Sequence, residues 1–229
     1  MAKDARARKT KTRILQAAEE LFLEQGYGET TLKDILARAH TSTGSFYHQL
    51  SGKPEVAEEL CLACLESQLI AIRSVIPPPT PRAKAVEGVQ SLIGGYLKWA
   101  IEKRHLVKLI ATLLPHVREK TMSRIAAKEA AIDGMIAAWA KQLIKSGKMR
   151  DVPPRVISAL LLGPTKALFL DWVRGMSDVD PSAHEATLVE AACSVLLPLA
   201  PVKPSGPEAR RPKRTPVAGK DAADLFGNT

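Results

Sequence analysis

The chain has 229 residues, of which 45% are hydrophobic, 25% are charged and 4% are aromatic. A chain of this length and composition can bury a substantial core, either as one medium domain or as a small domain joined to a larger one. Its 33 Lys and Arg residues against 24 Asp and Glu residues give a formal net charge of +9. This charge favours an anionic partner, either nucleic acid or an acidic membrane surface.

Membrane and secreted proteins are disfavoured. We find no apolar stretch of about 18 residues, so no transmembrane helix is predicted. The basic N-terminus lacks the hydrophobic segment of a signal peptide, and we expect a cytoplasmic protein without a membrane partner. Three cysteines are an odd number and do not suit a secreted disulfide scaffold. Cys61 and Cys64 lie in an apolar helical pattern, where packing is a better interpretation than metal or redox chemistry.

The first two elements are predicted to be helices. An amphipathic stripe is formed by Ile14, Ala17, Ala18, Leu21 and Phe22. Gly26 ends this helix. Thr31 is a good N-cap for a second helix, and Asp34, three residues later, completes a capping box.

The segment 40–50, HTSTGSFYHQL, contains hydroxyls, a glycine and adjacent aromatic residues, but no acid. Thr41 or Ser42 can cap a very short third helix. Phe46 and Leu50 are four residues apart and can point together into a small core.

A long fourth helix is predicted from about Lys53 to Val75, since the proline at position 54 is tolerated in a first helical turn. The sequence PPPTP at 77–81 stops this helix. The pattern is helical again beyond it, without strand-like alternation, and predicts helices near 82–103, 105–114, 118–146, 153–175 and 182–199.

Three short helices with the turn Ala39-His40-Thr41 between the second and the third fit a helix-turn-helix motif. The third helix of such a motif lies in the major groove of DNA, where hydroxyls and amides read base edges and a carboxylate would be repelled by phosphates. The absence of acids from 40–50 therefore indicates a DNA-reading helix. Gly44 would allow close approach of its backbone to the DNA.

The sequence GYGETTLKDILARAHTSTGSFYHQLSGKPEV, residues 26–56, resembles the DNA-binding domain of the TetR family of bacterial transcriptional regulators. The resemblance extends over about Thr10 to Leu60. It implies backbone contacts to DNA from Thr31, Ser42, Tyr47, His48 and Lys53, base contacts from Thr43, Ser45 and Gln49, and a base or phosphate contact from Lys33. The chain departs from the family pattern at His40, where glycine is common, and at Leu50, which replaces a phenylalanine.

The two ends of the chain are basic. Residues 1–13 carry six basic side chains against one acid, and we interpret them as a flexible arm for the minor groove or phosphates, or alternatively as a solvated disordered terminus. The basic residues are Lys3, Arg6, Arg8, Lys9, Lys11 and Arg13. The tail 201–229 is rich in proline and basic residues, so we expect disorder, with or without a contribution to non-specific DNA binding.

These patterns predict an all-α protein of about nine helices. A helix-turn-helix DNA-binding domain with its basic arm would occupy residues 1–55, a larger effector-binding and dimerisation domain residues 56–200, and the disordered tail residues 201–229. The helices near 155–174 and 183–199 are apolar around much of their circumference and need additional cover. The resemblance implies that they form a homodimer interface; the alternative is a buried monomeric core.

An effector pocket is predicted among the helices of residues 82–146. The candidate lining residues are Tyr96, Trp99, His105, His116 and Trp139, although each of these residue types is more often an ordinary core or surface residue. The apolar character of the candidates indicates a hydrophobic or aromatic effector.

The predicted function is that of a ligand-responsive DNA-binding transcriptional regulator. The dimer would repress from a palindromic operator, and a small effector would release it by shifting the population of conformers. We predict no enzyme activity, catalytic residue, metal or cofactor, since no phosphate-binding loop, metal-ligand cluster or paired carboxylates are apparent. The alternatives are an effector-independent architectural DNA-binding protein and a helical thiol-redox enzyme that uses Cys61 and Cys64.

Overall fold

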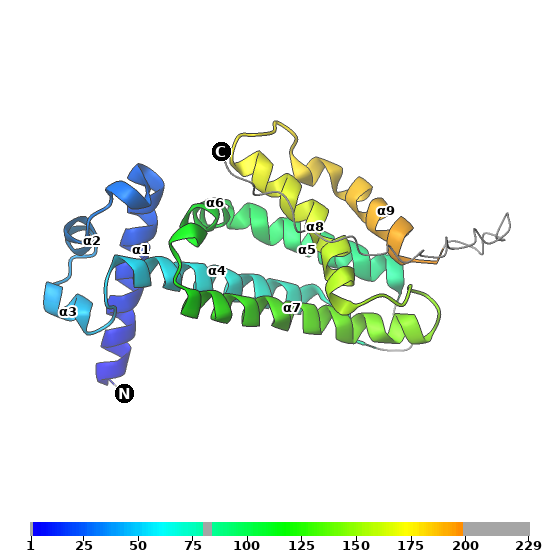
Figure 1. The fold of residues 1–229 in the computed structure, drawn as a ribbon, viewed down its shortest axis with the longest axis horizontal. Coiled ribbons are helices and arrows are strands. Elements are labelled where there is room, and N and C mark those ends of the chain that lie inside the picture. The colour runs from blue at the N-terminus through cyan, green and yellow to red at the C-terminus, as the bar shows by residue number, and fades with distance from the viewer. Residues whose placement is uncertain (1, 80–83, 199–229) are drawn as a thin grey trace, which may run out of the picture. The chain divides into compact units, whose positions relative to one another are not determined.

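The computed structural model describes residues 2–79 and 84–198, and within these ranges its regular secondary structure is helical (Figure 1). The all-α prediction is therefore confirmed. The α-helices are α1 (Ala2–Glu29), α2 (Leu32–Arg38), α3 (Thr43–Tyr47), α4 (Lys53–Val75), α5 (Ala85–Glu102), α6 (Arg104–Leu113), α7 (Glu119–Lys145), α8 (Pro154–Val173) and α9 (Glu185–Leu196). Two 3-10 helices are η1 (Leu114–His116) and η2 (Pro181–His184).

The N-terminal helices share one hydrophobic core. The five apolar side chains of the α1 stripe are all buried, as predicted. Phe46 and Leu50 are 0% and 2% exposed, so they hold α3 and the following turn against α1 and α4. Leu109 of α6 and Ile125 of α7 also belong to this core. The sequence did not indicate that α6 and α7 would complete the core of the helix-turn-helix.

A larger core lies among α4, α5, α7, α8 and α9, which pack against one another. Trp139 of α7 is fully buried, and its indole lies on Gly88 of α5, where an added Cβ would stand 2.3 Å from Trp139 Cζ2. Along α4, Val56, Leu60 and Cys64 are buried, whereas Ala63 is exposed. Helix α4 contributes to both cores and thus connects the two groups of helices.

The N-terminal segment corrects one prediction, because it is part of α1 and not a flexible arm. Alanine, lysine and arginine are good helix formers, and residues 2–13 contain neither glycine nor proline. The hydroxyls of Thr10 and Thr12 donate to the carbonyls of Arg6 and Arg8, four residues earlier. Gly26 breaks the regular helix with a φ of 86°, at the position where the sequence predicted its end. The tail 201–229 lies outside the described residues.

Helix α8 corrects a second prediction. By length and composition it could span a membrane, although no apolar stretch of that length was recognised in the sequence. A core helix of a globular protein passes the same test, and α8 packs against α5, α7 and α9. Six of its side chains are buried, among them Leu161, Leu162 and Phe169. Its apolar composition is thus partly explained by the larger core.

Candidate nucleic-acid interface

The turn between α2 and α3 has the geometry of a helix C-terminus closed by a left-handed residue. His40 has a φ of 47° and is the one non-glycine residue with positive φ in the described part of the chain. The amide of Thr41 donates to the carbonyl of Leu36 at 3.1 Å, and that of His40 to Ala37 at 3.2 Å. Histidine tolerates this conformation better than most residues. The turn predicted at Ala39-His40-Thr41 is therefore formed despite the missing glycine.

Helix α3 packs on the protein core through one side and exposes the other side to solvent. Ser42 is its N-cap, and the Ser42 hydroxyl accepts a hydrogen bond from the Ser45 amide at 3.2 Å. The Phe46 ring is buried and meets the ring of Tyr47 edge-on, with 5.4 Å between the centroids. Tyr47 keeps 56% of its surface exposed. The ring contact fixes the tyrosine, while its hydroxyl is available to a partner.

The predicted base-reading and backbone-contacting positions of α3 lie on its exposed side. These residues are Ser42, Thr43, Gly44, Ser45, Tyr47 and His48, and Gln49 beside them is half-buried. An added Cβ at Gly44 would meet nothing within 4 Å, and the glycine does not have a positive φ. Neither packing nor backbone conformation requires glycine there. The space above position 44 is therefore open to an external molecule, as close approach of DNA would need.

Two residues to which the resemblance assigns phosphate contacts are engaged within the protein. The Thr31 hydroxyl donates to Asp34 Oδ2 at 2.6 Å and its amide donates to the same atom at 2.9 Å, so the capping box is formed. Lys53 Nζ donates to the carbonyls of Tyr27 and Thr30, both at 2.8 Å, and lies 4.4 Å from the centroid of the Tyr27 ring. Lys53 thereby ties the start of α4 to the turn after α1. Lys33 is exposed.

The N-terminal part of α1 lies beside α3, which the interpretation as a flexible arm missed. A groove of about 360 Å³ is lined by Arg6, Ala7 and Thr10 of α1 and by Ser45, His48 and Gln49. Lys11, by contrast, is bound to Glu59 of α4, with 2.7 Å between Nζ and Oε2. The uninterrupted helix-forming sequence before Ile14 was the signal that could have revealed this arrangement.

Comparisons with known proteins identify this domain. The family model described as "Bacterial regulatory proteins, tetR family" matches residues 14–60. The transposon Tn10 TetC protein of Escherichia coli is 25% identical over 150 residues, which are 66% of this chain and 73% of that protein. Residues 14–60 therefore match the DNA-binding domain of the tetR family of bacterial regulatory proteins.

Two further proteins with similarity to this chain are named as transcriptional regulators. The HTH-type transcriptional repressor KstR2 of Mycobacterium tuberculosis (strain ATCC 25618 / H37Rv) is 30% identical over 92 residues, 40% of this chain and 44% of the repressor. The crystal structure of the transcriptional regulator FadR from Bacillus subtilis in complex with stearoyl-CoA has a TM-score of 0.67. The superposition covers 80% of this chain and 97% of FadR. At 17% sequence identity, this comparison shows that the two proteins share a fold.

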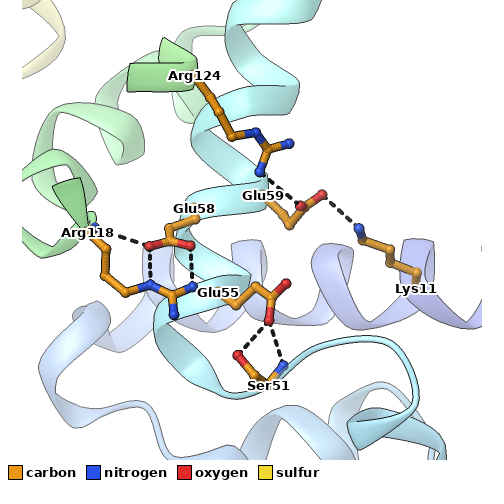
Figure 2. A network of polar contacts seen from close by, with 7 residues as sticks. All are labelled: Lys11, Ser51, Glu55, Glu58, Glu59, Arg118 and Arg124. Carbon is orange, nitrogen blue, oxygen red and sulfur yellow. Dashed lines mark hydrogen bonds and ion pairs between the residues drawn. The ribbon is translucent and has the colours of Figure 1, made fainter. Parts of the chain in front are cut away.

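Ion pairs connect α4 to the start of α7 (Figure 2). Glu58 is 3% exposed, and the Nε and Nη2 atoms of Arg118 donate to its two oxygens, each at 2.6 Å. The hydrogen-bonded guanidinium lowers the pKa of Glu58 to about 2. The next residue, Glu59, accepts a hydrogen bond from Lys11 and lies 4.0 Å from Arg124. The carboxylates of α4 thus join α1 to α7.

In addition to the Glu58–Arg118 ion pair, an aromatic contact joins the same two parts of the molecule. His116 of η1 stacks on Tyr27, with 4.5 Å between ring centroids and an interplanar angle of 20°. Tyr27 also contacts Phe22 edge-on and carries the Lys53 ammonium on its ring. The segment between α6 and α7 therefore rests on the turn before α2. A shift of η1 or of the start of α7 would therefore displace α1 and α4, the helices against which α3 packs.

The five predicted pocket residues occupy different environments. Tyr96, Trp99 and Trp139 are buried in the larger core, and burial raises the pKa of Tyr96. Trp99 Nε1 donates to the Ser67 hydroxyl at 3.0 Å, which ties α5 to α4. His105 and His116 are exposed, and His116 contacts the DNA-binding domain instead of the larger core.

The two cysteines of α4 are buried free thiols. Burial raises the pKa of Cys61 to about 11 and that of Cys64 to about 12. Both thiols are protonated at neutral pH and are therefore poor nucleophiles and poor metal ligands. Their contacts with the two cores support the interpretation as packing residues.

Proposed function

We propose that this protein is a homodimeric transcriptional repressor that binds a palindromic operator with α3 of each subunit and is released by a small-molecule effector. The observation that carries the DNA-binding part is the exposed, acid-free side of α3, held in place by buried Phe46 and Leu50. The hydroxyls and amide on this side can read base edges, and the Tyr47 hydroxyl can bind a phosphate. Such a protein would act where the chromosome lies, in the cytoplasm.

The dimer is supported by the surfaces of α8 and α9. Val156 of α8 is 41% exposed and Val195 of α9 is 45% exposed, although both helices also bury an apolar side in the larger core. Apolar residues on both sides of a helix need cover from the core and from a second subunit. A two-fold dimer would place two copies of α3 on one side, separated by about one or two turns of DNA.

Release by an effector is supported by the connection between the two cores. Glu58 with Arg118, and Tyr27 with His116, join the DNA-binding helices to η1 and to the start of α7. A ligand that favours another arrangement of the C-terminal helices would shift the population toward dimers whose α3 helices no longer fit the operator. KstR2 is named a repressor, and the FadR structure of similar fold contains stearoyl-CoA.

The test begins with selection of the operator from a pool of random duplex DNA. Binding of this operator and of a scrambled duplex is then measured by fluorescence anisotropy for the wild type and for Thr43→Ala, Tyr47→Phe and Gln49→Ala. We expect each variant to lose about 5- to 100-fold in operator affinity with an unchanged melting temperature. Selection of no sequence would support an architectural protein, and unchanged affinity in all three variants would contradict the assignment of α3.

A further inference from the structure

A small cleft lies between α7 and α8, outside the group of aromatic residues predicted to hold an effector. Its volume is about 180 Å³. Apolar side chains of both helices line it, together with a set of charged and polar ones. The residues used below are Ile132 and Asp133 of α7 and Arg155, Ser158, Leu162 and Lys166 of α8.

The charges of this cleft are not all paired. Arg155 Nη1 binds Asp133 Oδ2 at 2.8 Å, and Arg155 Nη2 lies 4.0 Å from Glu129 Oε2. Both acids are thus engaged by Arg155. Lys166 is half-buried, its ammonium lies 5.9 Å from the centroid of the Tyr96 ring, and no carboxylate in the described ranges is within ion-pair distance of it. Burial lowers the pKa of Lys166, as expected for an ammonium that lacks a close counter-ion.

Ser158 provides a second, independent observation. Its side chain is on the wall of the cleft, the residue is 6% exposed, and its hydroxyl has no hydrogen-bond partner. A buried hydroxyl without a partner is uncommon, since it forfeits its hydrogen bonds to water. The cleft therefore contains an unsatisfied hydroxyl and an ammonium without a counter-ion.

We infer that this cleft binds a small carboxylic acid in its ionised form, with the carboxylate paired to Lys166 and hydrogen-bonded by Ser158, and the apolar part on Ile132 and Leu162. The inference rests on the proposed function, because it names the chemical class of the effector. An anionic group supplies what both unsatisfied side chains lack, whereas a neutral hydrocarbon would leave the cation buried and unpaired. A cavity of about 150 Å³ accepts benzene, so a small acid of roughly the size of benzoate suits this cleft of about 180 Å³.

The experiment uses benzoate and hexanoate as probes, with benzamide and hexanamide as neutral controls of similar shape. Melting temperatures of the full-length protein are measured with each compound for the wild type, Lys166→Met, Ser158→Ala and Lys145→Met. Lys145 is an exposed lysine of α7 and serves as the matched control. At saturating concentration we expect the two acids to raise the melting temperature of the wild type and of Lys145→Met by about 2–4 °C. This rise should disappear in Lys166→Met and shrink in Ser158→Ala.

A second measurement does not depend on the folding of a variant. The lysine side chains of the wild type are dimethylated with ¹³C, the Lys166 signal is assigned by its absence in Lys166→Arg, and its chemical shift is followed during titration with benzoate. A saturable shift of this signal by benzoate and none by benzamide is expected. Equal effects of acid and amide, or a thermal response that survives in Lys166→Met, would overturn the inference.

Failure of the inference can be separated from failure of the proposed function by adding the operator. If benzoate binds at Lys166 but the protein–operator complex persists, the site stands and its role as an effector site is wrong. If other compounds release the operator equally from the wild type and from Lys166→Met, the protein is ligand-responsive and the cleft is not its effector site.

Discussion

Arg118 holds Glu58 in a two-pronged ion pair, and its backbone amide donates a third hydrogen bond to the same carboxylate at 3.1 Å. Arg118 is the N-cap residue of α7, so the carboxylate also faces the positive end of that helix dipole. Glu58 lies in the first two turns of α4, immediately after the helix-turn-helix. This buried acid is therefore one of the contacts that join α7 to the DNA-binding domain.

The first prediction concerns the pH dependence of stability. The folded-state pKa of Glu58 is about 2, lowered from 4.5. Its contribution is therefore fully present above about pH 4.5 and is lost as the pH falls toward 2. Glu58→Gln should lower the free energy of unfolding at pH 7 by about 1–3 kcal/mol, because the arginine loses its carboxylate. Its stability should then fall less steeply than that of the wild type between pH 4.5 and 2.

Urea titrations followed by circular dichroism at pH 7, 4 and 3 measure this difference. Other carboxylates of the chain also titrate in this range, so only the difference between wild type and variant is informative. Glu190→Gln, at an exposed position of α9, is the control. Parallel stability curves for the wild type and Glu58→Gln between pH 7 and 3 would show that the ion pair does not stabilise the fold.

A second prediction separates two glycines that the sequence alone does not distinguish. Gly88→Ala should destabilise the protein by about 1–3 kcal/mol, because the added methyl would stand 2.3 Å from a buried atom of Trp139. Gly44→Ala meets no protein atom and exchanges glycine for a better helix former, so stability should be unchanged or higher by up to about 1 kcal/mol. Operator affinity should nevertheless fall in Gly44→Ala if the DNA backbone approaches position 44. Thermal melts and anisotropy titrations of both variants check this pair of opposite outcomes.

A third prediction compares two lysines of the DNA-binding domain. Lys53→Met should lower the free energy of unfolding by about 1–3 kcal/mol, since the carbonyls of Tyr27 and Thr30 lose their donor. Lys33→Met, at an exposed position, should change stability by no more than about 0.5 kcal/mol while weakening DNA binding. Chemical denaturation and anisotropy measure both quantities. If Lys53→Met is as stable as the wild type, the hydrogen bonds of Lys53 to Tyr27 and Thr30 do not stabilise the fold. Lys53 would then act only in binding DNA phosphates.

Local signals were sufficient to predict the helix-turn-helix and the approximate bounds of the helices that follow it. The Thr31–Asp34 capping box, the Ser42 cap and the Phe46–Leu50 pair depend on residues within four positions of one another, and all are formed. Such short-range interactions can be predicted directly from the spacing of residue types in the sequence. The left-handed turn at His40 was also predictable. Glycine is common at this position in the family, and histidine tolerates a positive φ better than most other residues.

The contacts between distant residues were not predictable in the same way. Lys53 meets Tyr27 over 26 positions and Arg118 meets Glu58 over 60, and no periodicity couples such pairs. The resemblance implied a DNA-backbone contact for Lys53, and no residue pattern indicated that Arg118 would pair with Glu58. His116 was a candidate pocket residue of the helices near 82–146, and the structure stacks it on Tyr27. In each case the side chain meets a partner from another helix, which short-range patterns do not reveal.

The last prediction concerns the basic residues of α1. Arg6 lines the groove beside α3 and is exposed, whereas Lys11 is bound to Glu59. If a DNA strand enters this groove, Arg6→Ala should reduce the slope of log Kobs against log salt concentration by about 0.9, the value for one phosphate contact. Lys11→Ala should change the slope much less, because its ammonium already has a carboxylate partner. Anisotropy titrations at several salt concentrations compare the two variants, which remove one positive charge each from the same helix. An equal decrease in both would indicate that the net charge of α1 attracts DNA and that Arg6 makes no contact of its own.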